Sequence, residues 1–235
     1  MDRDPRPGHG TSTAAQRRAQ IIAATMRLIA RDGVAALSTR TIAREAGVNL
    51  GTLHHLFGAK DDLLLAVLDA ATSALIAALI LVDGHPGGGL RTALRESFAT
   101  LCALLDREPA LPLVRCEVLL YARGRPLQAA SAVQKQRYLD ALAICYRVAG
   151  APGELSLLPS EELAAVVSSS IDGLALQTAT GVPLREQTAT RAQMLHALLA
   201  LVPGTSAGRQ ACDDDGDAAR PVRLVEDAIK SVRHQ

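Results

Sequence analysis

The chain has 235 residues, which is long enough to bury a sizeable core in one or two domains. Hydrophobic residues make up 49% of the chain and charged residues 21%, a balance that is typical of a folded protein and excludes a disordered one. Aromatic residues are only 2% and tryptophan is absent, so the core must consist of aliphatic side chains, which favours packed helices over sheets.

The net charge of +1 conceals an asymmetry between the two parts of the chain. Residues 1–60 contain nine basic and four acidic side chains, whereas the remainder contains 16 basic and 20 acidic ones. A basic head on an acidic body indicates that the head, and not the whole protein, contacts a polyanion.

Four helices are predicted in the first third of the chain, after a polar arm over residues 1–13. The first is expected over residues 14–31, because its apolar residues recur at helical spacing and Asp32-Gly33 supplies a stop. The other three are expected over residues 40–46, 50–57 and 60–82.

Beyond a glycine-rich loop at residues 84–89, the sequence predicts only further helices, separated by glycine and proline breaks. No alternation typical of strands occurs, so the chain is predicted to be all-α. A polar linker and a short amphipathic helix are expected over residues 203–235. The helices between are expected over residues 90–106, 109–122, 126–149, 160–180 and 184–202.

Residues 37–60 carry the strongest local signal, two short helices joined by a turn at Gly47. Ser38 or Thr39 can cap the first of these helices, and Asn49 can cap the second. Small alanines between them let the two helices cross closely, and the glycine permits a left-handed turn. This is helix-turn-helix construction, in which the second helix enters the major groove of DNA.

The same stretch closely resembles the DNA-binding domain of the TetR family of bacterial transcriptional regulators. The resemblance extends from Ala14 to about Leu68 and includes the words IARDG at residues 29–33 and IAREAGVNLGTLHHLFGAKDDLL at residues 42–64. It implies contacts with double-stranded DNA from Thr39, Arg40, Thr41, Asn49, Leu50, Gly51, Thr52, His54, His55 and Lys60.

The sequence departs from the family pattern in two places, at Leu50 and at residues 54–56. Leu50 stands where relatives often have a polar or basic residue, so a hydrogen bond to a base is replaced at best by contact with a thymine methyl group. The trio His54-His55-Leu56 replaces a more aromatic one. The resemblance therefore does not predict the operator sequence.

The predicted domains are the head over residues 14–59 and a larger body over residues 60–202. The resemblance implies that the body forms a homodimer through a four-helix bundle. In line with this, the helices at 160–180 and 184–202 are apolar over more than one face. The expected dimer contacts are Leu163, Val167, Ile171, Leu174, Leu195, Leu198 and Leu199.

The remaining helices of the body are expected to enclose a pocket for a small-molecule effector. Pockets are mostly apolar with a few convergent polar groups, so polar residues stranded among apolar ones are the candidates for its lining. These candidates are Arg115, Glu117, Tyr121, Tyr138, Tyr146, Asp172 and Gln177.

The sequence does not support a metal site, a cofactor site or an enzymatic function. His54 and His55 are adjacent on a helix and diverge by about 100°, without a cysteine or carboxylate at ligand spacing. The acidic run at residues 213–217 lacks the ligands of a calcium loop, and the run at 87–89 lacks the lysine of a phosphate-binding loop. We therefore expect no metal, no cofactor and no enzymatic activity.

The sequence also predicts the compartment. No apolar run approaches the roughly 18–20 uninterrupted residues of a membrane span, and the N-terminal arm is too polar for a secretion signal. The four cysteines lack paired spacing, which is typical of reduced thiols. We expect a cytoplasmic protein that does not enter a membrane.

The function expected is a ligand-responsive homodimeric regulator, most often a repressor, that binds a pseudo-palindromic operator and is released by its effector. An activator of the same family and a non-specific architectural DNA-binding protein stay open as alternatives. Arg3 and Arg6 could reach an adjacent minor groove, or belong to a solvated tail.

Overall fold

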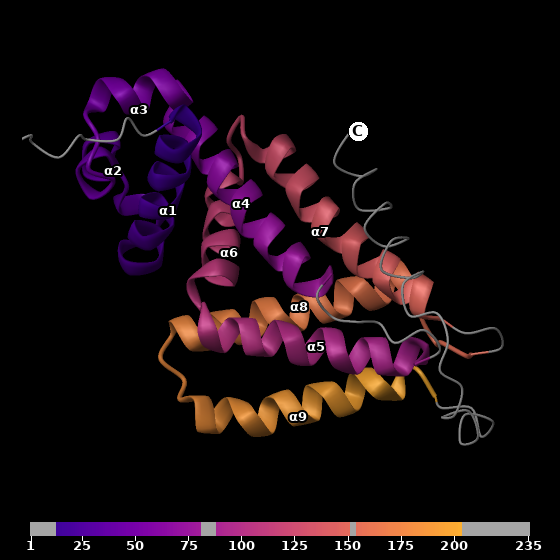
Figure 1. Ribbon diagram of the computed structural model, residues 1–235. Coiled ribbons are helices and arrows are strands. Elements are labelled where there is room, and N and C mark those ends of the chain that lie inside the picture. Colours follow the sequence, from indigo (N-terminus) through magenta and orange to yellow (C-terminus); the bar gives the residue numbers. More distant parts are fainter. Residues whose placement is uncertain (1–12, 81–87, 151–153, 204–235) are drawn as a thin grey trace, which may run out of the picture. The chain divides into compact units, whose positions relative to one another are not determined.

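The computed structural model describes residues 13–80, 88–150 and 154–203, and over these residues all regular structure is helical (Figure 1). The all-α fold class expected from the sequence is thus confirmed. The predicted arm lies outside the described residues apart from Thr13, as do most of the glycine-rich loop and of the linker and terminal helix predicted over 203–235.

The helices agree with the predicted ones to within about two residues at each end, apart from a short 3₁₀ turn that was not predicted. They are α1 (Ala14–Asp32), the 3₁₀ turn η1 (Val34–Ala36), α2 (Thr39–Glu45), α3 (Leu50–Phe57), α4 (Lys60–Ile80), α5 (Gly89–Arg107), α6 (Ala110–Ala122), α7 (Gln128–Ala149), α8 (Ser160–Ala179) and α9 (Leu184–Ala200).

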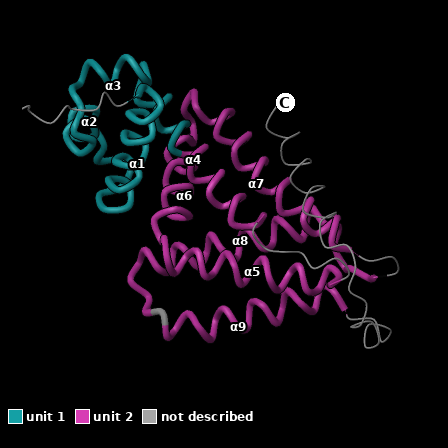
Figure 2. Tube along the Cα trace, viewed as in Figure 1, with its two compact units in different colours: residues 1–67 teal, residues 68–235 magenta. Residues whose placement is uncertain are grey.

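The chain divides into two compact units, the first ending at Val67 and the second beginning at Leu68 (Figure 2). The boundary therefore falls within α4, whereas the sequence prediction placed it ahead of that helix, between residues 59 and 60. The start of α4 is joined to the first unit by Lys60, whose Nζ donates to the carbonyl oxygen of Leu37 at 2.8 Å.

Local signals define the helices of the first unit. Thr13 and Gln16 form a capping box at the start of α1, each side chain bonding the other residue's backbone N–H. Gly33 ends the helix with φ 77°, and its N–H donates to the carbonyl of Ile29 at 2.8 Å. Ile21 and Leu28 carry the buried stripe of α1, against which α2 and α3 pack.

The second unit is a bundle in which α7 packs along α8, and α5 contacts both α8 and α9 (Figure 1). Its core is aliphatic, as the composition predicts, with Leu94, Val114 and Leu142 fully buried. Arginines link the helices in pairs. Arg191 of α9 donates to both carboxylate oxygens of Asp106 of α5, at 2.8 and 2.9 Å.

Helix α4 corrects one expectation from the sequence. By length and mean hydropathy it would be able to cross a membrane, even though Asp69, Thr72 and Ser73 interrupt its apolar run. Half of the residues in its most apolar stretch are buried inside the protein, which is typical of a core helix of a bundle. Thr72 is fully buried, and Arg137 of α7 donates to Asp69 and Ser73.

Candidate nucleic-acid interface and polar cluster of the body

The turn between α2 and α3 depends on one glycine. Gly47 has φ 63°, a left-handed conformation that side chains with a Cβ rarely adopt. The Val48 N–H donates to the carbonyl of Ala43 across the turn at 3.0 Å, and Gln20 of α1 donates from Nε2 to the carbonyl of Ala46 at 2.7 Å. The turn is therefore closed from both sides, which sets the direction in which α3 leaves it.

Helix α3 is held by its cap and by its inner face. The Asn49 side chain accepts the backbone N–H of Thr52 at 2.7 Å, as the sequence predicted for a cap. Leu53 and Phe57 are buried on the inner face. Arg18 of α1 stacks its guanidinium 4.4 Å from the centre of the Phe57 ring and also donates to a carbonyl near the end of α3.

The opposite face of α3 is exposed and carries the residues that the sequence singles out. Gly51, His54 and His55 are exposed, Thr52 is half-exposed, and the apolar side chain of Leu50 is 36% exposed. His54 Nδ1 lies 3.2 Å from the carbonyl oxygen of Gly58, which can only accept, so a neutral ring offers Nε2 as an acceptor. A short, firmly held helix with an exposed polar face has the form required to enter a major groove.

The start of α2 decides between the two residues expected to cap it. Ser38, and not Thr39, caps the helix, because the Ser38 Oγ accepts the backbone N–H of Thr41 at 3.1 Å. The Thr41 hydroxyl is already engaged within this cap, accepting from the Ser38 N–H and donating to the Ser38 carbonyl. Thr39 and Arg40 occupy the first turn, where Arg40 is exposed and Thr39 half-exposed. Lys60, expected to meet phosphate, uses one ammonium hydrogen on the Leu37 carbonyl.

A depression of about 390 Å³ runs between the start of α1 and the exposed face of α3. Arg17, Gly51, Thr52 and His55 are among the residues that line it, and Arg17 is exposed. The sequence interpretation missed Arg17. Its only signal is the Arg17-Arg18 pair, in which the neighbouring Arg18 faces Phe57 and has a structural role.

The body brings together three of the seven residues expected to line a pocket. Arg115 of α6 is 1% exposed, forms an ion pair through Nη2 with Asp172 of α8, and lies 4.8 Å from the centre of the Tyr138 ring of α7. Burial is the largest influence on the phenol and raises the pKa of Tyr138 far above its ordinary value. Burial likewise raises the pKa of the nearby Cys116 thiol to about 11. These groups therefore stay protonated at neutral pH.

The other candidates for the pocket do not share this arrangement. Tyr146 is buried, but its hydroxyl pairs with the Ser97 hydroxyl at 2.9 Å. The Tyr121 ring lies under the Arg125 guanidinium at 4.1 Å. Glu117 and Gln177 are partly exposed on α6 and α8.

Most of the residues expected at the dimer contact are buried within a single chain. Leu163, Val167, Ile171 and Leu174 are at most 2% exposed within a single chain, so they already fill the core of their own subunit. Leu198 and Leu199 are also buried, and Leu195 is half-exposed. The exposed part of α8 is the adjacent stripe of Val166, Ser169, Gly173 and Leu176, in which Gly173 is half-exposed.

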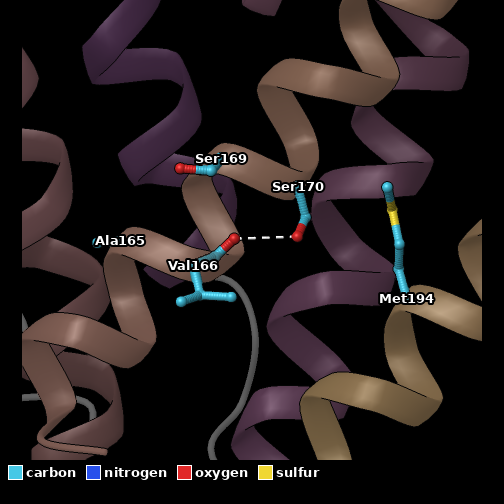
Figure 3. Close-up of a pocket in the computed structure, with 5 residues that line it drawn as sticks. All are labelled: Ala165, Val166, Ser169, Ser170 and Met194. Atoms are coloured by element: carbon cyan, nitrogen blue, oxygen red, sulfur yellow. Dashed lines mark hydrogen bonds between the residues drawn. The ribbon is translucent and has the colours of Figure 1, made fainter.

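That stripe borders a depression of about 440 Å³ between α8 and α9 (Figure 3). It is lined by small side chains of α8 together with Val166, which is 39% exposed, and Met194 of α9. The Ser170 hydroxyl donates to the carbonyl oxygen of Val166 at 2.9 Å, so this polar group does not need an outside partner. Leu176, 62% exposed, extends the apolar surface towards the end of α8.

Comparison with known proteins supports the reading of the head. The profile of the family described as "Bacterial regulatory proteins, tetR family" matches residues 21–67. The regulator PksA of Bacillus subtilis is 49% identical over 49 residues, which cover 21% of this chain and 24% of that protein. The nicotine-responsive repressor HdnoR of Paenarthrobacter nicotinovorans is 42% identical over 73 residues, or 29% of this chain and 36% of that protein. The matched segments thus span only about a quarter to a third of these relatives.

Solved structures are similar over most of the chain. A transcriptional regulator from Rhodococcus sp. RHA1 has a TM-score of 0.64 at 23% identity, covering 79% of this chain and 95% of that one. The multidrug binding protein EbrR, complexed with imidazole, has a TM-score of 0.60 at 24% identity, covering 81% and 97%. At these identities the likeness establishes a common fold, body included.

Proposed function

Because this chain belongs to the TetR family of bacterial regulatory proteins, we propose that it is a ligand-responsive homodimeric regulator of transcription. In this proposal it binds a pseudo-palindromic operator as a repressor, in the cytoplasm, and a small-molecule effector releases it. The observation that carries the proposal is the exposed polar face of α3, held from behind by Leu53, Phe57 and Arg18.

The direct test is selection of bound sequences from a random DNA pool at near-physiological salt. We expect enrichment of a pseudo-palindrome whose half-sites lie about one helical turn, or roughly 34 Å, apart, because each subunit of a dimer places one α3 in a major groove. Recovery of no enriched sequence by well-folded protein would contradict specific readout. It would favour the alternative of a non-specific architectural protein.

Arg17 is proposed to hold a DNA phosphate beside α3, because it is exposed and lines the same depression as Thr52 and His55. Substitution of Arg17 with alanine is expected to lower operator affinity about tenfold. It should also make the dependence of log affinity on log salt less steep by about two, one phosphate per subunit. Fluorescence anisotropy over a salt series measures both quantities.

The matched control is Arg27→Ala. Arg27 also lies on α1 but forms an exposed ion pair with Glu45 and does not line the depression. We expect its salt dependence to equal that of the wild type. A wild-type slope in Arg17→Ala would mean that Arg17 contacts no phosphate.

The homodimer is proposed to form across the exposed stripe of α8, defined by Val166, Ser169, Gly173 and Leu176. These positions recur at helical spacing, and Val166 and Leu176 are large apolar side chains left exposed in the isolated chain. The small residues between them let a second copy approach closely. When the stripes of two subunits meet about a two-fold axis, Val166 and Leu176 of each subunit would be buried.

Substitution of Gly173 with arginine is expected to weaken the dimer about 100-fold or more, because a charge would be buried against its own copy near the axis. The subunit itself should fold normally, since a Cβ at Gly173 meets no atom within 4 Å among the described residues. Analytical ultracentrifugation over a concentration series measures the dissociation constant.

Leu120→Arg is the matched control for this experiment. Leu120 is 73% exposed on α6, away from the stripe, so the same new charge there should leave the dimer intact. A dimer that survives Gly173→Arg unchanged would contradict the proposed interface.

Release by an effector is proposed to act through repacking of the body helices. HdnoR is named as nicotine-responsive and EbrR as multidrug binding, and these names support the expectation of a small-molecule effector here. A ligand that prefers a different packing of residues 90–180 would displace α4 and alter the separation of the two heads in the dimer. It can shift this equilibrium only by its difference in affinity for the two states.

A further inference from the structure

The cluster of Arg115, Tyr138 and Asp172 contains hydrogen-bond donors that the described part of the protein does not use. Arg115 Nη2 donates to Asp172, but Nε and Nη1 are buried and have no acceptor among the described residues. The Tyr138 hydroxyl is buried and equally unpartnered. Since Nε and Nη1 carry three of the five guanidinium N–H groups, the cluster has an excess of donors.

Such an excess is unusual in a protein interior, where buried polar groups are nearly always paired. The cluster is formed by three different helices, α6, α7 and α8. On α8, the Ser168 hydroxyl lies one turn before Asp172 and is also without a partner among the described residues. Tyr146 shows the ordinary case in the same bundle, because its buried hydroxyl pairs with Ser97. The unpaired donors therefore call for an acceptor from outside the described chain.

The charges of the cluster favour an anionic acceptor. Asp172 is the carboxylate that pairs with Arg115, and it keeps 29% of its side chain exposed. The Arg115 guanidinium, 1% exposed, thus meets through Nη2 alone a carboxylate that is itself partly exposed, and its other two nitrogens are left for a second anionic acceptor.

We infer that this cluster is the effector site and that the effector carries a carboxylate group, which accepts hydrogen bonds from Arg115 Nε and Nη1 and from the Tyr138 hydroxyl. The inference rests on the proposed function, because it assigns the chemical class of the proposed effector. In the ligand-free chain these donors are packed inside the bundle. Binding must therefore separate α6, α7 and α8 locally, which links occupancy of the site to repacking of the body.

Two chemically identical substitutions test the inference. Tyr138→Phe removes an unpartnered hydroxyl and keeps the ring beside Arg115, so the free protein should melt no lower than the wild type. Tyr146→Phe removes a hydroxyl that bonds Ser97, so it should lower the melting temperature. The two variants separate loss of a ligand contact from loss of a structural bond.

The probes are straight-chain and aromatic monocarboxylates, each paired with its primary amide and its primary amine, added to the full-length protein. We expect carboxylates, and not their amides or amines, to raise the wild-type melting temperature. Calorimetry should then show affinity for the best carboxylate lowered about tenfold or more in Tyr138→Phe, abolished in Arg115→Met and unchanged in Tyr146→Phe.

The inference is overturned if no carboxylate raises the melting temperature, if an amide or amine binds equally well, or if Tyr138→Phe binds as the wild type does. Operator binding without ligand is measured separately on the same samples. Loss of operator binding there would count against the proposed regulator. Intact operator binding with no response to any carboxylate would overturn the carboxylate site alone.

Discussion

Replacement of Asp172 with alanine is expected to lower the free energy of unfolding by about 3 kcal/mol, because it leaves the Arg115 cation buried without its carboxylate partner. Arg115 is 1% exposed, so its charge cannot turn to water without disrupting the packing of α6. The residual 29% exposure of Asp172 keeps the expected loss at the lower end of the range for buried pairs. Urea denaturation followed by circular dichroism measures the change.

Two further variants show whether the unpaired charge of Arg115 causes the loss of stability in Asp172→Ala. In Arg115→Met/Asp172→Ala the cation is gone, so most of the lost stability should return. Glu161→Ala removes the partner of Arg147 from an ion pair in which both side chains are more than 60% exposed, and should leave the denaturation midpoint unchanged. Equal losses in the single and double variants would show that Asp172 stabilises the bundle by packing and not by charge.

The double substitution Thr52→Ala/His54→Ala is expected to weaken binding to the selected operator about 100-fold or more. Each lost contact with a base edge costs about 1–3 kcal/mol, and a dimer loses every contact twice. The fold should be kept, because His54 is exposed and loses only its bond to the Gly58 carbonyl, and the Asn49 cap bonds the backbone, and not the side chain, of Thr52. Electrophoretic mobility shift with specific and scrambled DNA measures the effect.

His196→Ala, an exposed histidine on α9, is the control for loss of an imidazole outside the head. It should bind the operator as the wild type does. The double variant should keep its weak affinity for scrambled DNA, which depends on phosphate contacts such as that proposed for Arg17. A double variant that loses specific and scrambled DNA equally would indicate that these residues contact the backbone and do not read bases.

Much of the head could be predicted from local sequence because local chemistry defines its helices. The limits of α3 agree with the prediction, since Asn49 caps one end and Gly58, with φ 64°, ends the other. The choice between Ser38 and Thr39 as the cap of α2 could not be made in advance. Both residues can accept a backbone N–H, and only the path of the chain after η1 places Ser38 in the extended conformation that a cap requires.

The residues expected at the dimer contact show what the pattern of apolar residues leaves open. A wide apolar stripe on a helix indicates how much of its surface is buried. It does not indicate whether the subunit's own core or a second subunit buries it. Leu163 and Val167 lie against α8's own neighbours in the bundle, whereas Val166, one position away, stays exposed. Neighbouring positions on a helix point about 100° apart, so one can be buried while the next is exposed. The packing of α5, α6 and α7 against α8 decides which of them is buried.

The sequence by itself determined the all-α fold, the helix-turn-helix and its capped recognition helix, because these depend on propensities, caps and turn residues within a few positions of one another. Only the tertiary structure decided that Arg17 lies beside α3 and that Arg115, Tyr138 and Asp172 meet. The members of that cluster lie on three helices and are up to 57 residues apart in the sequence. Their encounter depends on the packing of whole helices, which no local pattern specifies.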